Sequence, residues 1–171
     1  MWVYTNYLLL MESNEIKNNA LKFLTDPEHL TAVVGSCPGD GDTHVATVYY
    51  YVDDNFNFYF LTATHTQKYE NLLNNPNAAI VVGFGPSYTT IQGQGTASLL
   101  KKASEEENNA IARIKKRLQD HNNETWPVFQ LNTFDGESIA VFKIIPDKLQ
   151  LLNLEESSGL VVTTENVLQI I

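Results

Sequence analysis

The sequence has little cysteine and few basic residues. Cys37 is the only cysteine among 171 residues, so no internal disulfide can form, and the histidines show no spacing typical of a zinc site. Only 11 lysines and arginines face 20 acidic residues, for a net charge of -9. This deficit argues against nucleic acid or an anionic membrane as the main partner, because both need a basic surface. A cytoplasmic protein is predicted, and a few local donors could still bind a small anionic ligand.

Long hydrophobic runs are missing as well. The apolar start of the chain, MWVYTNYLLLMESNE, is shorter than the roughly 20 apolar residues that span a bilayer, and it lacks the basic region of a signal peptide. The stretch after Met11 resembles an ordinary protein start. We therefore expect residues 1–12 to be a flexible or extended N-terminus, with residues 1–10 an upstream extension or the result of a start placed too early. The length suits a single domain over residues 1–171.

The motifs that carry difficult side-chain chemistry are not found. The sequence has no G-x-S-x-G, no H-E-x-x-H, no P-loop and no G-x-G-x-x-G. Its carboxylates are scattered over predicted helix surfaces, where solvation is their ordinary role. A chain without such machinery is what one expects when a cofactor supplies the chemistry.

Most of the regular patterns in the sequence are typical of β-strands. Runs rich in β-branched and aromatic residues predict strands at 30–36, 44–52, 56–62, 78–84, 88–100, 138–146 and 148–154. Apolar residues at helical spacing predict helices at 14–24, 66–75 and 104–118. Ser104 and Glu107 form a capping box at the start of the third helix. The apolar tail at 159–171 needs packing against the rest of the chain.

The spacing of these elements predicts the fold class. Most links between strands are too short for parallel crossovers, which need a dozen or more residues. The order α-β-β-β-α-β-β-α-β-β therefore predicts a mainly β protein with peripheral helices. An antiparallel six- or seven-stranded barrel, partly open, fits this order best.

One stretch changes character halfway along. Residues 58–77, FYFLTATHTQKYENLLNNPN, pass from an aromatic strand through a hydroxyl-rich turn into a short helix. The start of a helix presents unpaired N–H groups and the positive end of its dipole, and both suit a phosphate. Thr62, Thr64 and Thr66 add hydroxyl donors, and Lys68 adds a charge. The plainer alternative, which the spacing alone favours, is that Thr66 caps the helix and Lys68 is a solvated surface residue.

An ordered series of motifs resembles the pyridoxamine 5'-phosphate oxidase-like superfamily of FMN-binding split barrels. In order along the chain, the matching pieces are Phe60-Leu61-Thr62, Thr66-Gln67-Lys68, Asn75-Pro76-Asn77, Gly95-Thr96-Ala97 and Pro146-Asp147-Lys148-Leu149. Each piece alone is weak, but their order and spacing together are more specific. The resemblance implies a split-barrel fold and noncovalently bound FMN. It is closer to the general-stress-type members than to the authentic oxidase.

The resemblance also implies where FMN would bind. In relatives, the strand residues around the first threonine contact the flavin, and the lysine binds its phosphate. Carried over to this sequence, the FMN contacts are Ala46, Thr47, Val48, Leu61, Thr62, Thr66, Gln67 and Lys68.

The sequence departs from the oxidase in two respects. Ala46 and Gln67 stand where the oxidase has arginines, and each lost charge-assisted contact costs roughly 1.5–3 kcal/mol. The oxidases also carry a C-terminal Arg-x-His segment for the vitamin phosphate, whereas no arginine follows Arg117 here. An authentic vitamin B6 oxidase is therefore not expected.

The expected function is hydride or electron transfer through the flavin, with a nicotinamide nucleotide or a small reducible molecule as the other reactant. The resemblance implies a homodimer with FMN at the interface, and the consecutive Tyr49, Tyr50 and Tyr51 suggest one core face and one interface face. Three alternatives remain open. They are an F420-dependent reductase on the same fold, a flavin-binding or stress-response protein without turnover, and a cofactor-free interaction module.

Five other residues have both a functional and a structural interpretation. His44 and His65 could tune a flavin, or could be surface histidines in turns. Trp126 could stack near the partner's flavin, or could belong to the core. Gly93 and Gly95 could let a cofactor approach closely, or could mark a bulge that closes the barrel.

Overall fold

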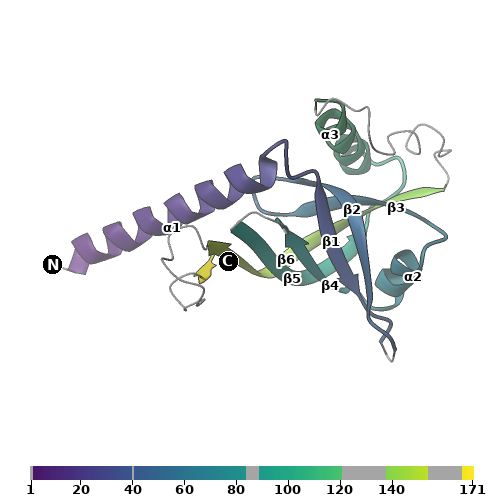
Figure 1. The fold of residues 1–171 in the computed structure, drawn as a ribbon, viewed down its shortest axis with the longest axis horizontal. Coiled ribbons are helices and arrows are strands. Elements are labelled where there is room, and N and C mark those ends of the chain that lie inside the picture. The colour runs from purple at the N-terminus through teal and green to yellow at the C-terminus, as the bar shows by residue number, and fades with distance from the viewer. Residues whose placement is uncertain (1, 40, 84–88, 121–137, 154–166) are drawn as a thin grey trace.

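A closed antiparallel barrel forms the centre of the molecule (Figure 1). The computed structural model describes residues 2–39, 41–83, 89–120, 138–153 and 167–171. The strands are β1 Thr31–Ser36, β2 His44–Val52, β3 Phe58–Ala63, β4 Asn77–Val82, β5 Thr89–Leu99, β6 Ile139–Asn153 and β7 Val167–Gln169. They follow the order β3-β2-β1-β4-β5-β6-β7, and β3 also pairs with β6, which closes the barrel. The predicted mainly β fold, an antiparallel split barrel, is confirmed.

The barrel is split between β2 and β3. These two strands pair only where Tyr50–Val52 faces Phe58–Phe60. Beyond that point β3 stays with β6, where Leu61 lies opposite Val141. The first half of β2 is therefore paired with β1 on one side only among the described strands.

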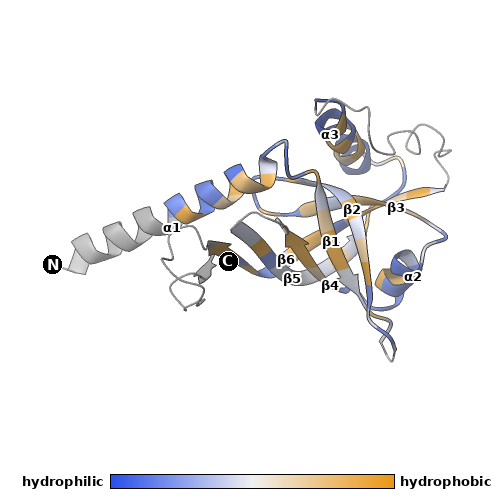
Figure 2. Cartoon of the chain, in the orientation of Figure 1, coloured by the Kyte–Doolittle hydropathy of each residue, from blue (hydrophilic) through white to orange (hydrophobic). Residues whose placement is uncertain are grey.

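The helices cover the barrel at its two ends and on one outer side (Figure 1). Helix α1, Trp2–Thr25, buries Ala20 and Leu24 at one end, and α2, Gln67–Asn74, buries Leu72 at the other. Helix α3, Glu105–Asp120, packs Ala110 outside β3 and β6. Figure 2 shows that the strands are largely hydrophobic, whereas α2 and α3 carry many hydrophilic residues on their exposed sides.

The predicted capping box at α3 forms with one difference. Glu107 N donates to Ser104 Oγ at 3.2 Å, as a capping box requires. The Glu107 carboxylate, which is buried, accepts from Ala103 N at 2.6 Å instead of from the N–H of Ser104. The Glu107 carboxylate thus binds the backbone N–H one residue before the position that a capping box uses.

Helix α1 is longer than the sequence predicts. It begins at Trp2, whereas the apolar spacing predicts a start at residue 14 and a flexible or extended segment before it. No glycine or proline interrupts residues 2–25, so nothing in the chain ends the helix before Pro27. Among the described residues, no helix combines the length and the hydrophobicity needed to cross a membrane.

The prediction of two separate strands at 138–146 and 148–154 is wrong, because β6 is one strand. Gln94 lies opposite Lys148 and Gly95 lies opposite Pro146, so Asp147 is an extra residue in the ladder. This β-bulge accommodates Pro146 within the strand, and the pairing with β5 continues on both sides of it. The observed order of elements still equals the predicted one, because β7, which comes from the apolar tail, is the last strand in place of the predicted strand at 148–154.

Candidate functional site

The eight residues expected to contact FMN lie on three elements around the split in the barrel. Ala46, Thr47 and Val48 lie on β2, Leu61 and Thr62 on β3, and Thr66, Gln67 and Lys68 at the start of α2. Helix α2 packs against both strands. The fold therefore brings the three segments to one side of the barrel.

The strand residues of this group do not all present side chains outward. Val48 is buried inside the barrel, and Ala46, which has the same parity, is partly buried. Thr47 points outward and is exposed. Leu61 is partly buried against the cluster formed with α3. A ligand outside β2 would thus meet the Thr47 side chain and the strand backbone.

The threonine hydroxyls are used inside the turn. Thr66 Oγ1 donates to Ala63 O at 2.8 Å, and Thr62 Oγ1 lies 2.9 Å from Thr66 Oγ1. Thr62 Oγ1 also lies 3.4 Å from Ala63 O, so either hydroxyl can donate in the pair, and both protons have an acceptor within the turn. Neither proton is left for a phosphate, and only Thr64 keeps a hydroxyl without a partner among the described residues. These hydroxyls, of the buried Thr62 and the partly buried Thr66, therefore hold the shape of the turn.

The plainer alternative, in which the Thr66 side chain caps the helix, does not hold either. Thr66 occupies the N-cap position with an extended backbone, but its side chain makes no capping hydrogen bond. Its carbonyl accepts from Tyr69 N at 3.0 Å and from Glu70 N at 3.3 Å. The N–H groups of Gln67 and Lys68 have no partner among the described residues, so they remain donors at the start of α2.

Lys68 is the cation of the site. Its side chain is partly buried, and burial lowers the pKa of its ammonium group below the usual 10.5. It forms no ion pair with any described residue. Gln67, beside it, is exposed. A partly desolvated cation next to two free N–H groups favours an anion at this position.

A buried polar contact that the sequence did not indicate holds α2 in place. Asn71 Nδ2 donates to Ser36 Oγ at 3.3 Å, and both side chains are buried. Asn75 Nδ2 donates to the carbonyl of Cys37 at 3.0 Å. The asparagines in NLLNNPN were the available signal, but their partners, Ser36 at the end of β1 and Cys37 just after it, are distant in the sequence.

The two histidines differ in their surroundings. His65 is exposed in the turn before α2, as a surface histidine would be. His44 is partly buried opposite Ser36 in the β1–β2 ladder, and its Nδ1 is buried with no hydrogen-bond partner in the part of the chain that the structure describes. Trp126 lies outside the described residues.

The structure supports the bulge interpretation of Gly95. A Cβ at this position would collide with Ile145 O and would lie 2.6 Å from Pro146 Cα, so β6 occupies the space that a side chain needs. At Gly93 a Cβ would lie 2.7 Å from Leu149 Cδ1. These glycines allow close approach between strands where the register shifts.

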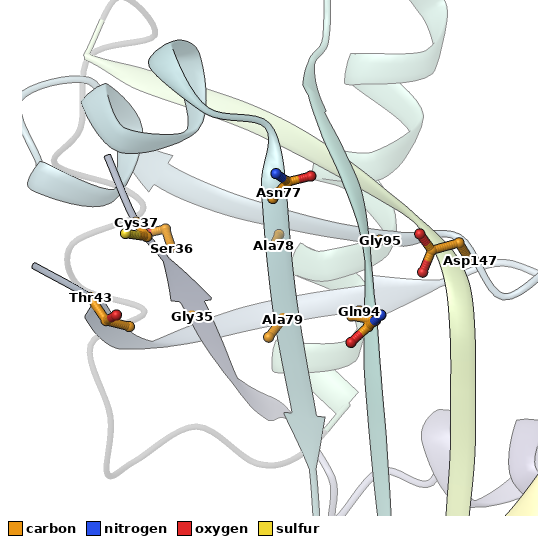
Figure 3. A pocket seen from close by; sticks show the side chains of 10 residues that line it. All are labelled: Gly35, Ser36, Cys37, Thr43, Asn77, Ala78, Ala79, Gln94, Gly95 and Asp147. Carbon is orange, nitrogen blue, oxygen red and sulfur yellow. The ribbon is translucent and has the colours of Figure 1, made fainter. Parts of the chain in front are cut away.

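Two hollows lie apart from this site. One, of about 360 Å³, is on the outer side of β1, β4 and β5 and includes Gly35, Ala79 and Gln94 (Figure 3). The other, of about 540 Å³, lies between α3 and the β2–β3 hairpin, beside Tyr59. Neither is lined by any of the eight residues.

An antiparallel barrel split between two strands, with a helix starting at the split, defines the class of split-barrel proteins. The chain belongs to the pyridoxamine 5'-phosphate oxidase family, whose model matches residues 16–150. No curated protein matches the chain.

Solved structures share the fold at low identity. General stress protein 26 from Bacillus anthracis is 21% identical, with a TM-score of 0.58 over 80% of this chain and 92% of its own. A pyridoxamine 5'-phosphate oxidase-related, FMN binding protein from Nostoc punctiforme is 14% identical, with a TM-score of 0.53 over 87% and 84%. The heme storage protein HutZ from Vibrio cholerae is 16% identical, with a TM-score of 0.60 over 74% and 87%. At these identities the likeness concerns the fold.

Proposed function

We propose that this chain binds FMN noncovalently at the split between β2 and β3 and serves as a flavin-dependent oxidoreductase. The observation that carries the proposal is Lys68, a partly buried cation that has no counter-ion among the described residues and lies at a helix start with two N–H groups that have no partner there either. The family and the FMN binding relative from Nostoc punctiforme support it. Bound FMN would supply hydride or electron transfer to a nicotinamide nucleotide or a small reducible molecule.

The residues of the chain would act by binding and orientation. Lys68 and the N–H groups at the start of α2 would hold the phosphate. The Thr62–Thr66 hydroxyl pair would hold the turn in shape, and Asn71 would keep α2 on β1. No group among the eight residues is a general acid or base apart from the lysine. The site therefore fits a cofactor that brings its own reactivity.

The charge of the site also favours a second candidate. Ala46 and Gln67 are neutral, so of the eight residues only Lys68, together with the end of the helix dipole, would supply positive charge to a phosphate. An FMN phosphate carries nearly two negative charges at neutral pH, whereas the phosphodiester of F420 carries a single charge. The single cation matches the diester more closely. An F420-dependent reductase is accordingly the second candidate, and flavin binding without turnover is the third.

The deciding experiment is an absorbance scan of the purified chain before and after incubation with FMN and desalting. Retained visible flavin bands are expected, and F420 tested in the same way ranks the first two candidates. A donor screen with reduced nicotinamide nucleotides then separates an enzyme from a protein that only holds flavin. A chain that stays colourless with FMN would defeat the proposal.

A further inference from the structure

The larger of the two hollows, of about 540 Å³, lies between the start of α3 and the β2–β3 hairpin and is here called the α3 hollow. Helix α3 packs against both strands (Figure 1). The strands contribute Tyr51 and Tyr59, the hairpin contributes Asp53, and the first turn of α3 contributes Glu105 and Glu106. Among the described residues, no lysine or arginine lines the hollow. Its volume is within the range that small-molecule ligands occupy.

Two tyrosine rings line the strand side of the α3 hollow. Tyr51 and Tyr59 lie opposite each other in the β2–β3 ladder, and their rings stack with centres 5.6 Å apart. Each ring already has a cation of the chain near it. Arg113 lies 5.8 Å from the centre of the Tyr51 ring, and Lys143 lies 5.4 Å from the centre of the Tyr59 ring. The faces of aromatic rings attract cations, and both rings of this pair are arranged in that way.

The carboxylates of the α3 hollow outnumber the cations that pair with them. Lys143 pairs with Glu106 at 2.9 Å. Glu105 is exposed and forms no ion pair with any described residue. Asp53 accepts hydrogen bonds from backbone N–H groups, from an amide and from a phenol, and none of these donors is charged. Two carboxylates of the hollow thus have no cationic partner in the part of the chain that the structure describes.

The hydroxyl of Tyr59 lies between two of these carboxylates. Its oxygen is 3.2 Å from Asp53 Oδ2 and 3.1 Å from Glu106 Oε1. A phenol has one proton, so it donates to one carboxylate at a time, and the other carboxylate oxygen meets the phenol oxygen with no proton between them. A ligand that carries a positive charge and several N–H donors would relieve this contact.

The simplest explanation of acidic residues at a helix start is the helix dipole, which favours negative charge there. It accounts for Glu105 and Glu106. It does not account for Asp53, which approaches from the facing hairpin, or for the stacked tyrosines. A hollow, a pair of rings and carboxylates from both sides therefore occur together at one place, and this combination suits a cationic ligand.

We infer that the α3 hollow binds a small organic cation with a primary ammonium group, such as a polyamine. Its N–H groups would donate to Glu105 and to the carboxylate oxygen that Tyr59 leaves without a proton, and its alkyl part would lie on the rings. An organic cation fits better than a metal ion, because the described residues contain no group of three or more histidine, cysteine or acidic side chains that could hold one. The inference does not depend on FMN, since none of the eight expected FMN contacts lines this hollow.

The experiment is isothermal titration calorimetry of the full chain with spermidine. The wild type is expected to bind spermidine at a single site. Glu105→Gln is expected to weaken binding about threefold or more, because it removes a carboxylate that has no other cation to pair with among the described residues. Tyr51→Leu is expected to weaken it by a similar factor, whereas Tyr51→Phe keeps the ring and should bind like the wild type. Asp53 is left unchanged, because it holds the hairpin.

The matched control is Glu70→Gln, which removes the same charge at an exposed position on α2, outside the hollow. It should bind spermidine like the wild type, whereas a cation attracted only by the net charge of -9 would be weakened equally by both variants. Circular dichroism and thermal unfolding establish that every variant is folded. A wild type that binds no spermidine, or equal weakening by Glu70→Gln and Glu105→Gln, would overturn the inference. Tyr51→Phe binding as weakly as Tyr51→Leu would overturn it as well, because the ring would then play no part.

Discussion

Lys68 is the residue on which the cofactor assignment depends most. Replacing it with alanine removes the one cation at the start of α2 and leaves the two free N–H groups. We expect FMN to bind at least about tenfold more weakly, or about 1.4 kcal/mol, with little change in the free energy of unfolding. Fluorescence titration of FMN measures the first quantity and urea unfolding the second. Lys101→Ala, at an exposed lysine outside the site, is the control and should bind FMN normally.

The same residue predicts a pH dependence. Burial lowers the pKa of the Lys68 ammonium group below 10.5, so the group loses its proton earlier than an exposed lysine does. Its contribution to FMN affinity is present below that lowered pKa and is lost as the pH rises through it. Titrations of the wild type should show this alkaline loss, and titrations of Lys68→Ala should not. Parallel curves for the two proteins would show that the ammonium group does not contact the phosphate.

Gly95 is a position where adding a single Cβ atom is expected to destabilise the fold. A Cβ there would collide with Ile145 O and approach Pro146 Cα to 2.6 Å, and both partners are backbone atoms that cannot rotate away. Gly95→Ala should lower the free energy of unfolding by roughly 1–3 kcal/mol or more. Gly39→Ala, where a Cβ would meet nothing within 4 Å, is the control. Equal stability of the two variants would mean that β6 can move aside at no cost.

The threonines show what the sequence could and could not predict at this scale. The sequence identified Thr62 and Thr66 by type and spacing, and the structure places both at the turn before α2. It could not show that Ala63 O lies within hydrogen-bond distance of both hydroxyls, because that depends on how the turn folds back. The direction of a hydroxyl proton depends on backbone geometry that a motif does not contain.

At the scale of elements, Arg117 joins α3 to the end of α1. Its NH1 donates to Leu24 O at 3.1 Å, and its NH2 donates to Asp26 O at 3.2 Å and to His29 O at 2.8 Å. Its guanidinium also lies 5.1 Å from the centre of the Tyr50 ring. Leu24 O lies in the last turn of α1, where it also accepts from Tyr50 Oη at 2.7 Å, and Asp26 and His29 lie in the segment that follows the helix.

Arg117→Met should therefore lower the free energy of unfolding by roughly 2–4 kcal/mol, because three charge-assisted hydrogen bonds are lost. Hydrogen exchange should speed up in the last turn of α1. Arg113→Met is the matched control, since Arg113 only lies over the Tyr51 ring at 5.8 Å, and it should cost less than about 1 kcal/mol. Equal losses for both variants would show that Arg117 does not hold α1.

A polar group around Tyr59 links α3 to β3 and β6. Tyr59 Oη lies 3.2 Å from Asp53 Oδ2 and 3.1 Å from Glu106 Oε1, and Lys143 Nζ pairs with Glu106 at 2.9 Å. Desolvation raises the pKa of Tyr59 from 10.0 to about 12. The phenol therefore keeps its proton in the folded chain after the unfolded chain has lost it.

The sign of this shift gives a prediction for alkaline stability. The stabilisation is fully present below pH 10.0 and is lost as the pH rises from there through about 12. Urea unfolding at about pH 9 and about pH 11 should show a fall in stability that is smaller in Tyr59→Phe. Burial also raises the pKa of Tyr50, so the variant should keep part of the fall. If the free energy of unfolding falls equally in both proteins, Tyr59 does not contribute to the alkaline loss of stability.

The elements that the sequence missed share a physical reason. Proline usually ends a strand in sequence patterns, yet Pro146 is tolerated because Asp147 forms a bulge opposite Gln94 and Gly95. The start of α1 was missed because the apolar spacing is clear only from Ile16 onward, whereas helix continuity needs only the absence of breakers. The continuity of β6 depends on the residues opposite it on β5, and the start of α1 depends on the absence of helix-breaking residues. Neither is visible as a local pattern in the sequence.

For the whole molecule, short links between strands were enough to predict the barrel. They exclude parallel crossovers, and an antiparallel sheet of this length closes readily. The family motifs likewise located the segments that meet at the split. What the sequence did not show is which strand residues become neighbours across the sheet, because Gly35, Val45 and Ala79 are brought together only by the register of three strands.

The binding of FMN to the whole molecule can be tested through its stability. A ligand that binds only the folded chain stabilises it by about 2.7 kcal/mol at about 100 times its Kd. For a chain of this size that corresponds to a rise in Tm of roughly 5–10 °C. Riboflavin has the same ring system without the phosphate, so at the same concentration its smaller effect isolates the contribution of the start of α2.

The expected pattern in a thermal shift series is a large rise with FMN, a smaller one with riboflavin, and a narrower gap between them in Lys68→Ala. The gap narrows because the variant keeps the contacts of β2 and β3 and loses the cation that only the phosphate meets. If FMN and riboflavin raise the Tm of the wild type equally, the flavin binds without using the start of α2. The phosphate assignment would then fail even though the chain binds flavin, and Lys68 would be left as a partly buried lysine with a structural role.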